Sequence, residues 1–296
     1  ENPACSVESV PVSVNDRTRF IYEAACCGLR DFFVKNGYKK ACVGVSGGID
    51  SAVVACLAVA ALGAENVRGL MMPSQFSSEG SVEDAKQLAE NLGIEFHVVP
   101  ITEAYRSIVD TLIPVIGGTD FDATEENIQS RIRTLMLMAL QNKNGYILLN
   151  CSNKSENALG ICTLYGDTGG AFSVTGDLYK TEMYDLARYI NRKFGAPIPE
   201  NILTKEPSSE LRPNQKDSDM RPSYEVVDAI LYRLIEDGQS REEIINAGFD
   251  SDEVQKIYAM VMRNEKKRFQ YPPVLRLSSS SFGHEYRMPL THKYVK

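Results

Sequence analysis

The sequence SGGIDS at residues 46–51 joins an apolar run at 41–45 to a stretch of small, helix-compatible residues at 50–61. This order predicts a strand, a tight turn and a helix. Glycines let the backbone approach a ligand closely, and the free N–H groups at a helix N-terminus attract anions. The loop therefore predicts a site for a phosphate-type anion. Asp50 would repel that anion unless a metal ion intervenes, and a carboxylate beside bound phosphates is a usual arrangement for Mg²⁺.

The same alternation of strand and helix signals continues along the chain. Further apolar runs predict strands at 67–72, 96–99 and 146–150, and helical spacing of apolar residues predicts helices at 17–35, 81–91 and 127–142. Strands that alternate with helices indicate an α/β fold with a doubly wound parallel sheet. After residue 180 the strand signals fade, and helical patterns follow at 181–194, 224–236 and 252–267. We therefore expect a single domain over 1–296, with a core at 14–200 and a helical C-terminal elaboration at 201–296.

Composition excludes several classes of protein. The 296 residues are 43% hydrophobic, enough to bury a substantial core. The 32 basic and 39 acidic residues give a net charge of −7, which argues against a general electrostatic grip on nucleic acid or anionic lipid. The sequence has neither an apolar run of membrane-spanning length nor the pattern of a signal peptide. Seven cysteines without CxxC spacing favour a reducing, cytoplasmic setting.

A second group of polar residues follows the predicted strand at 146–150. In parallel sheets of this kind ligands bind where strands end. Polar and charged side chains converge there, at Ser152, Asn153, Lys154, Glu156, Asp167 and Lys180. Such a group favours a ligand or metal site, although a solvated loop is the alternative interpretation.

The phosphate loop lacks the lysine of a GxxxxGK[ST] motif, so γ-phosphate transfer in the P-loop manner is not expected. It resembles the SGGxDS loop of the ATP pyrophosphatase (PP-loop) superfamily, which has an adenine nucleotide alpha hydrolase-like, Rossmann-like fold. Three further segments resemble the NAD synthetase family: NKSE at 153–156 followed by YGD at 165–167 and then Lys180, EENIQ at 125–129 followed by two arginines, and PSSELRP at 207–213. The resemblance covers residues 14–289.

That resemblance implies an ATP-dependent amidation of deamido-NAD to NAD. The carboxylate would be adenylated and then attacked by ammonia, releasing AMP and pyrophosphate. The implied ATP-binding residues are Ser46, Gly47, Gly48, Asp50, Ser51, Met72, Lys180 and Ser208. The implied deamido-NAD-binding residues are Asn127, Arg131, Asn153 and Asp167. Asp167 and Lys180 would be catalytic, while Asp50 and Glu156 would hold Mg²⁺. For Arg131, a surface ion pair with Glu125 or Glu126 is the alternative.

Some residues depart from the family pattern. Cys151 stands where relatives commonly have threonine, and a thiol is a weak hydrogen-bond partner. His284 and Glu285 stand where short ammonia-dependent enzymes tend to have a basic pair. The segments 165–172 and 266–273 look more like the glutamine-dependent class, which carries an N-terminal glutaminase domain. Since nothing of that size precedes residue 14, and the first residue is Glu1, we expect the synthetase part of a longer glutamine-dependent protein. On its own this chain should use free ammonia only, and a glutaminase domain or subunit is an expected partner.

Two further expectations concern motion and assembly. A reactive adenylate needs shielding from water, so the segments 76–81 and 208–222 are candidate mobile loops. The family resemblance implies a homodimer, and one apolar face of the helix at 127–142 could contribute, with Ile132, Leu135, Met136 and Ala139. That face could equally be ordinary core.

Four alternative functions share the phosphate loop. A tRNA thiolase would usually need a reactive cysteine pair and a basic surface, against which the charge and the scattered cysteines argue. The block from NKSE to YGD argues against GMP or asparagine synthetase. A non-catalytic nucleotide-sensing module could lose Glu156 or Lys180, and both are present.

Overall fold

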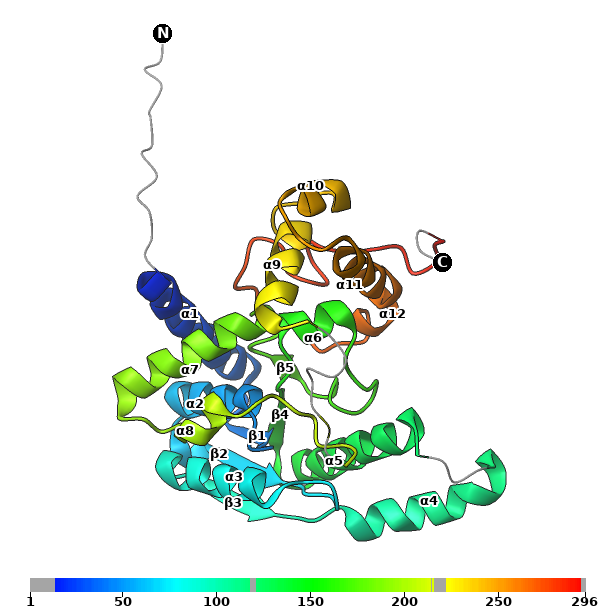
Figure 1. The fold of residues 1–296 in the computed structure, drawn as a ribbon. Coiled ribbons are helices and arrows are strands. Elements are labelled where there is room, and N and C mark those ends of the chain that lie inside the picture. The colour runs from blue at the N-terminus through cyan, green and yellow to red at the C-terminus, as the bar shows by residue number, and fades with distance from the viewer. Residues whose placement is uncertain (1–13, 118–120, 214, 216–221, 294–296) are drawn as a thin grey trace.

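A parallel five-stranded sheet forms the centre of the computed structural model, which describes residues 14–117, 121–213, 215 and 222–293 (Figure 1). In spatial order the strands are β3 (Glu95–Val98), β2 (Val67–Met71), β1 (Lys40–Gly44), β4 (Tyr146–Asn150) and β5 (Phe172–Ser173). All four neighbouring pairs are parallel. Strand order runs outward from β1 in both directions, so the predicted doubly wound α/β class is confirmed.

Helices cover both faces of the sheet. One face carries α1 (Val14–Asn36), α2 (Ile49–Leu62), α3 (Glu79–Leu92) and α7 (Lys180–Phe194), and a short 3-10 turn, η1 (Ala64–Asn66), follows α2. The other face carries α4 (Thr102–Ile116) and α5 (Ala123–Asn144). Side chains alternate across a strand, so in β1 Ala41 and Val43 enter the first core while Cys42 enters the second.

The remaining helices of the described chain are short or belong to its C-terminal part. They are α6 (Lys154–Leu159), α8 (Glu200–Thr204), α9 (Tyr224–Ile235), α10 (Arg241–Asn246), α11 (Ser251–Arg263) and α12 (Glu265–Arg268). Helices α6, α9, α10 and α11 share their own apolar core, and Figure 1 shows them grouped beside one end of the sheet. Within the described ranges no helix is long and apolar enough to cross a membrane.

The structure differs from the predicted elements in several places, and the short helices α6, α8 and α10 were not predicted. The helix expected over 252–267 is divided at Asn264, whose side chain donates to the carbonyl oxygens of Leu159 and Met260, both at 2.8 Å. Helix α4 was not predicted, and it contains Pro114, a residue that usually indicates a helix end. Strand β5 has two residues, too few for a period-2 pattern.

The apolar face of α5 is divided between core and surface. Ile132 is buried in the core beneath the sheet, and Met136 packs against that core. Leu135 is 67% exposed, and Ala139 is also exposed. Ile132 and Met136 therefore belong to the core, as one of the two interpretations predicted. Leu135 and Ala139 lie on the surface, and their contact with a partner stays a prediction.

Candidate functional site

The candidate site lies between β1 and β4. This is the topological switch point of the sheet, because the chain adds strands on opposite sides of it. In doubly wound sheets ligands bind in the crevice at the carboxyl ends of such strands. Strand β1 leads into the predicted phosphate loop and α2, and β4 leads through residues 151–153 into α6. The two polar groups singled out in the sequence therefore meet at one edge of the sheet.

The phosphate loop has the backbone that a strand-to-helix turn requires. Gly47 has a φ of +78°, and a Cβ there would lie 2.2 Å from the main-chain oxygen of Ser81. Only glycine fits such a position without displacing a neighbour. The Ser46 hydroxyl accepts from the Gly48 N–H at 3.2 Å and lies 3.1 Å from the Ser51 hydroxyl. The loop thus presents two serine hydroxyls at the start of α2, a helix of 14 residues.

Lys180 joins the two carboxylates that were predicted to hold a metal ion. Its Nζ donates to Asp50 Oδ2 at 2.5 Å and to Glu156 Oε1 at 3.3 Å. Burial alone would lower the pKa of Lys180, but Asp50 and Glu156 outweigh it, so the pKa lies well above its ordinary value. A buried cation thus lies beside the phosphate loop, where it can stabilise an anion.

The Asn153 side chain links the Asp50 carboxylate to the start of the helix that carries Glu156. The Asn153 Nδ2 group donates to Asp50 Oδ1 at 3.0 Å, and its Oδ1 accepts from the Glu156 N–H at 3.0 Å as the N-cap of α6. Asn153 is fully buried. It therefore lies beneath the carboxylates rather than in the wall of the cleft, and its predicted contact with deamido-NAD stays a prediction.

Lys180 is placed by a second buried carboxylate. Asp228 of α9 accepts from the Ser155 hydroxyl at 2.5 Å and from the Thr181 N–H at 2.8 Å. The Ser155 hydroxyl in turn accepts from the Lys180 N–H at 2.9 Å. Burial raises the pKa of Asp228 to about 6, more than these hydrogen bonds lower it. The first turns of α6 and α7 are thereby fixed to each other and to the C-terminal helices.

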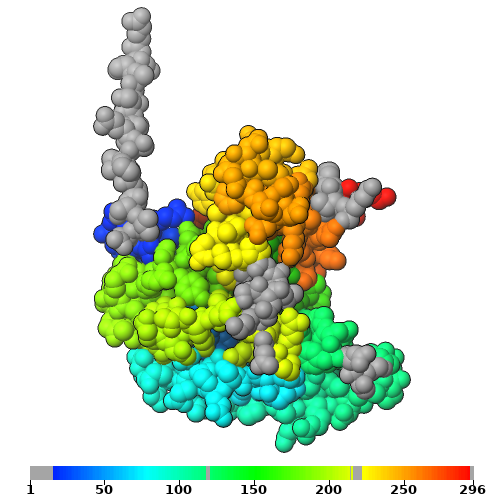
Figure 2. Space-filling view, viewed as in Figure 1, coloured from blue at the N-terminus to red at the C-terminus, as the bar shows by residue number. Residues whose placement is uncertain are grey.

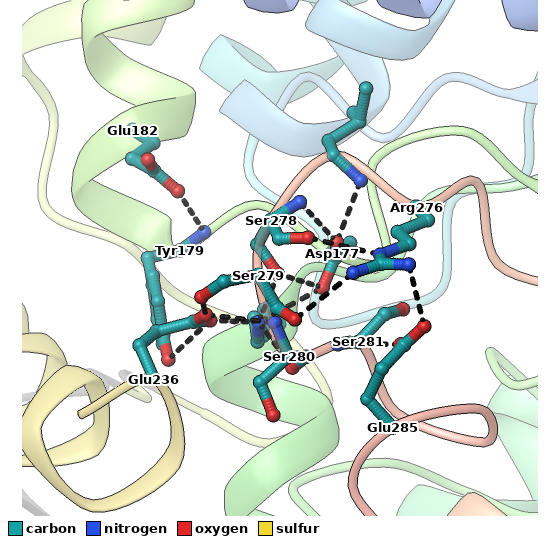
Figure 3. Close-up of polar contacts among 12 residues, drawn as sticks. Asp177, Tyr179, Glu182, Glu236, Arg276, Ser278, Ser279, Ser280, Ser281 and Glu285 are labelled. Carbon is teal, nitrogen blue, oxygen red and sulfur yellow. Dashed lines mark hydrogen bonds and ion pairs between the residues drawn. The ribbon is translucent and has the colours of Figure 1, made fainter. Parts of the chain in front are cut away.

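Lys154 does not face the cleft, whereas Glu156 of the same NKSE motif does. Its side chain has 0% exposure and forms ion pairs with Asp177, at 2.9 Å, and with Glu236. Figure 3 shows these two carboxylates beside the segment 276–281, whose Ser278 hydroxyl also accepts from Lys154 at 2.7 Å. Burial alone would raise the pKa of Glu236, but the hydrogen bonds from Lys154 and Ser279 outweigh it and leave the pKa below its ordinary value. Lys154 therefore joins the sheet to the C-terminal part of the chain.

Asp167 lies on a turn at the other end of the cleft. Its carboxylate accepts from the Thr163 N–H at 2.8 Å and from the Ser130 hydroxyl at 3.2 Å. The residue is exposed to the cleft, while protein atoms surround its carboxyl group on the other sides. Desolvation raises the pKa of its carboxyl to about 6, more than these two hydrogen bonds lower it.

Asn127 and Arg131 support the Asp167 turn from behind. The Asn127 side-chain oxygen accepts from the Thr163 hydroxyl at 2.6 Å, and Arg131 Nε donates to the Leu164 carbonyl oxygen at 3.2 Å. Glu126, one of the two carboxylates considered as partners of Arg131, lies 3.7 Å from Arg212. Neither Asn127 nor Arg131 lines the cleft, so their contact with a dinucleotide stays a prediction.

One cleft contains most of the predicted residues, with a volume of about 1740 Å³ including its open mouth. Its walls include Ser46, Gly48, Asp50, Ser51, Met72, Glu156, Asp167, Lys180 and Ser208. Cys151 also lines it, and burial raises the pKa of this thiol, so the thiol is protonated at neutral pH. Arg133 and Glu210 line the same cleft and stand in the motifs at 125–133 and 207–213, but no role for either was predicted. Burial lowers the pKa of Arg133 to about 10, so it remains cationic at neutral pH.

The two cleft carboxylates suit one kind of metal ion. Among the described residues no three His, Cys, Asp or Glu side chains form a group that could hold a metal ion. Asp50 and Glu156, however, both reach the one ammonium group of Lys180. Mg²⁺ usually takes one or two carboxylates and completes its shell with water and substrate phosphates. The donor set therefore fits a Mg²⁺ ion that arrives with a nucleotide.

Several known proteins similar to this chain are named NAD synthetases. The family described as NAD synthase matches residues 21–271. The glutamine-dependent NAD(+) synthetase of Aquifex aeolicus is 51% identical over 276 residues, which are 93% of this chain and 48% of that protein. Thus the chain spans about half the length of that relative.

Two solved structures extend the comparison. The glutamine-dependent NAD+ synthetase of Acinetobacter baumannii, in complex with ADP, is 40% identical with a TM-score of 0.64, and the match covers 96% of this chain and 51% of that one. The NH3-dependent NAD synthetase of Campylobacter jejuni, in complex with the nitrate ion, is 30% identical with a TM-score of 0.67 and coverages of 84% and 96%.

Proposed function

This chain belongs to the NAD synthase family, and we propose that it converts deamido-NAD to NAD with ATP and ammonia, releasing AMP and pyrophosphate. The observation that carries the proposal is the contact of Lys180 with Asp50 and Glu156 beside the phosphate loop. A cation and two carboxylates at the start of α2 suit the phosphates of a nucleotide with its metal ion.

The chemistry explains why ATP is needed. A carboxylate does not react with ammonia, because its leaving group would be oxide. Attack of the nicotinate carboxylate on the α-phosphorus of ATP turns that oxygen into part of AMP, and ammonia then displaces AMP to give the amide. In this proposal Ser46, Gly48 and Ser51 bind the pyrophosphate, Met72 lies at the nucleotide, and Lys180 stabilises the charge on the α-phosphate.

Asp50 and Glu156 would hold Mg²⁺ on the phosphates. The metal ion would neutralise phosphate charge and bring the triphosphate into one conformation. Asn153 would hold the Asp50 carboxylate in place through its hydrogen bond, and it also fixes the main chain at Glu156. The ion pairs of Lys180 with Asp50 and Glu156 would place its ammonium group between the two carboxylates, close to the departing pyrophosphate.

Asp167 would act on the nitrogen donor. A carboxyl with a pKa of about 6 is ionised at neutral pH and can accept a proton from ammonium. The Thr163 and Ser130 contacts keep the carboxylate oriented into the cleft. Ser208 would approach the phosphates from the opposite wall.

The partners of the chain are part of the proposal. We propose a homodimer that uses the exposed half of the α5 face, where Leu135 is 67% exposed. Glutamine-derived ammonia would come from a glutaminase domain or subunit, which the similarity to glutamine-dependent enzymes supports. The 296-residue chain would then use free ammonia on its own.

The test is NAD formation by this chain from deamido-NAD, ATP and Mg²⁺, with ammonium chloride or glutamine as the nitrogen donor. We expect NAD and AMP with ammonium and neither product with glutamine, and Asp50→Ala should abolish both products. Absence of NAD and AMP with either donor would refute the assignment and favour a nucleotide-sensing module. AMP release that depends on guanine-nucleotide precursors or tRNA would favour the other PP-loop enzymes.

A further inference from the structure

Glu210 ties the two walls of the cleft together. Its carboxylate accepts from the Ser78 N–H at 3.1 Å, from the Ser78 hydroxyl at 2.8 Å and from the Ser81 hydroxyl at 2.8 Å. Ser78 is the N-cap of α3, and Glu210 lies on the segment that follows α8, 132 residues later in the sequence. One side chain thus bridges the two segments that were predicted to be mobile.

The backbone at Glu210 is shaped for this contact. Its φ is +49°, in the left-handed region that residues other than glycine seldom occupy. Such a conformation persists where surrounding contacts hold it, and it concentrates at functional sites. The Glu210 N–H donates to the Ser208 hydroxyl at 3.2 Å, and that hydroxyl donates to the Gln215 carbonyl oxygen at 2.6 Å. The turn that directs Glu210 to α3 therefore also places Ser208.

Ser81, one of the residues that Glu210 contacts, lies against the phosphate loop. Ser81 lies in the first turn of α3, and its main-chain oxygen is the atom that leaves no room for a Cβ at Gly47. Lys205 Nζ donates to the Ser81 hydroxyl at 3.1 Å and to Asp84 Oδ2 at 2.8 Å, which adds a second link from the same segment. Figure 2 shows the yellow segment before the grey residues lying against the cyan surface of α3. A shift of Ser208 away from the phosphates would therefore require Glu210 to release Ser78 and Ser81.

We propose that Glu210 is a positioning residue that holds Ser208 over the phosphate loop and keeps water from the adenylate. The proposal rests on the proposed function, since it concerns the intermediate of that reaction. Without the tie, water can attack the carbonyl carbon of the adenylate. The bond from that carbon to the phosphate oxygen then breaks, AMP leaves, the proton passes to solvent, and the original carboxylate is restored. ATP would be consumed without formation of NAD.

The test compares Glu210→Ala, Glu210→Gln and the control Glu200→Ala. Glu200 is an exposed carboxylate on α8, so its removal changes the net charge by the same amount close to the same segment. AMP and NAD are measured in the same reaction with ammonium, and the KM for ATP is measured separately. Loss of hydrogen bonds to a charged group should raise the KM for ATP about tenfold in Glu210→Ala.

The ratio of AMP to NAD is the decisive measurement. We expect one AMP per NAD in the wild type and in Glu200→Ala, and an excess of AMP in Glu210→Ala. Glu210→Gln keeps a side-chain oxygen that can accept from Ser78 and Ser81, so it should restore most of the coupling. An unchanged ratio and KM in Glu210→Ala would overturn the proposal, as would a lower kcat alone, because a merely structural role predicts only that.

A second variant removes a partner of Glu210 on α3. Ser81→Ala removes one donor and should raise the AMP excess in the same direction by a smaller factor. In the double variant with Glu210→Ala the effects should not add, since Glu210→Ala already removes the Ser81–Glu210 hydrogen bond that Ser81→Ala removes. Simple additivity would overturn the proposal. If the wild-type chain makes no NAD, the proposed function fails, whereas a coupled wild type with coupled variants refutes the tie alone.

Discussion

The change Lys154→Met should weaken the fold more than any surface change. The lysine side chain is 0% exposed, and its partners Asp177 and Glu236 are 0% and 2% exposed. Methionine keeps the length of the side chain but leaves two buried carboxylates without their cation. Removing one member of a buried ion pair costs about 3–5 kcal/mol. Asp177 keeps donors from Leu277 and Ser278, so we expect the lower end of that range.

A loss of about 3 kcal/mol should lower the Tm by about 6–12 °C for a chain of this size. Urea unfolding followed by circular dichroism gives the free energy of unfolding directly. The control is Lys86→Met, since Lys86 forms an exposed contact with Glu83 at 3.7 Å and should lose at most about 1 kcal/mol. Equal losses in the two variants would refute the view that the buried ion pairs of Lys154 secure the C-terminal helices.

Three further predictions concern the cleft. Gly47→Ala should displace the phosphate loop and raise the KM for ATP more than tenfold, which corresponds to roughly 1.4 kcal/mol of binding free energy or more. The control is Gly93→Ala, because Gly93 has a φ of +65° and open space around it. This control should lower stability without changing the KM for ATP. The rate with ammonium should fall as the pH drops below about 6, because Asp167 becomes protonated there and can no longer accept a proton; a pH–rate profile without this limb would contradict its role. Asp50→Asn and Glu156→Gln should each raise the Mg²⁺ concentration needed for half-maximal rate, and titration with Mg²⁺ at fixed ATP measures it.

The sequence predicted the central strands β1, β2 and β4 because most of their residues are buried. Apolar runs such as 41–45 and 67–72 have few alternatives to a central strand. The alternation of strands and helices does not specify the order of the strands in the sheet. The structure shows that β1 lies between β2 and β4. Strand β5 was beyond prediction, since two residues at Phe172–Ser173 owe their pairing to β4 and to a contact of Ser173 with the Pro273 carbonyl oxygen at 2.9 Å.

The sequence predicted which polar residues form the candidate site, but it did not predict the direction of every side chain. A sequence gives the spacing of polar residues, whereas the direction of each side chain depends on packing. Lys154 and Asn153 illustrate the difference: both stand in a polar motif, yet one faces the C-terminal helices and the other lies beneath Asp50. Glu210 could not be assigned for a related reason, because its partners on α3 are more than a hundred residues away in the sequence.

Helix α6 explains why such different roles occur in four consecutive residues. Successive residues of a helix point about 100° apart, so a short helix beside the cleft presents different faces to different neighbours. Glu156 faces Lys180 in the cleft, while Lys154 enters the buried ion pairs with Asp177 and Glu236. Ser155 binds Asp228 on a third side. The C-terminal helices therefore contact the cleft through the same turn of α6 that supplies the Glu156 carboxylate. A change in the packing of these helices should therefore displace Glu156.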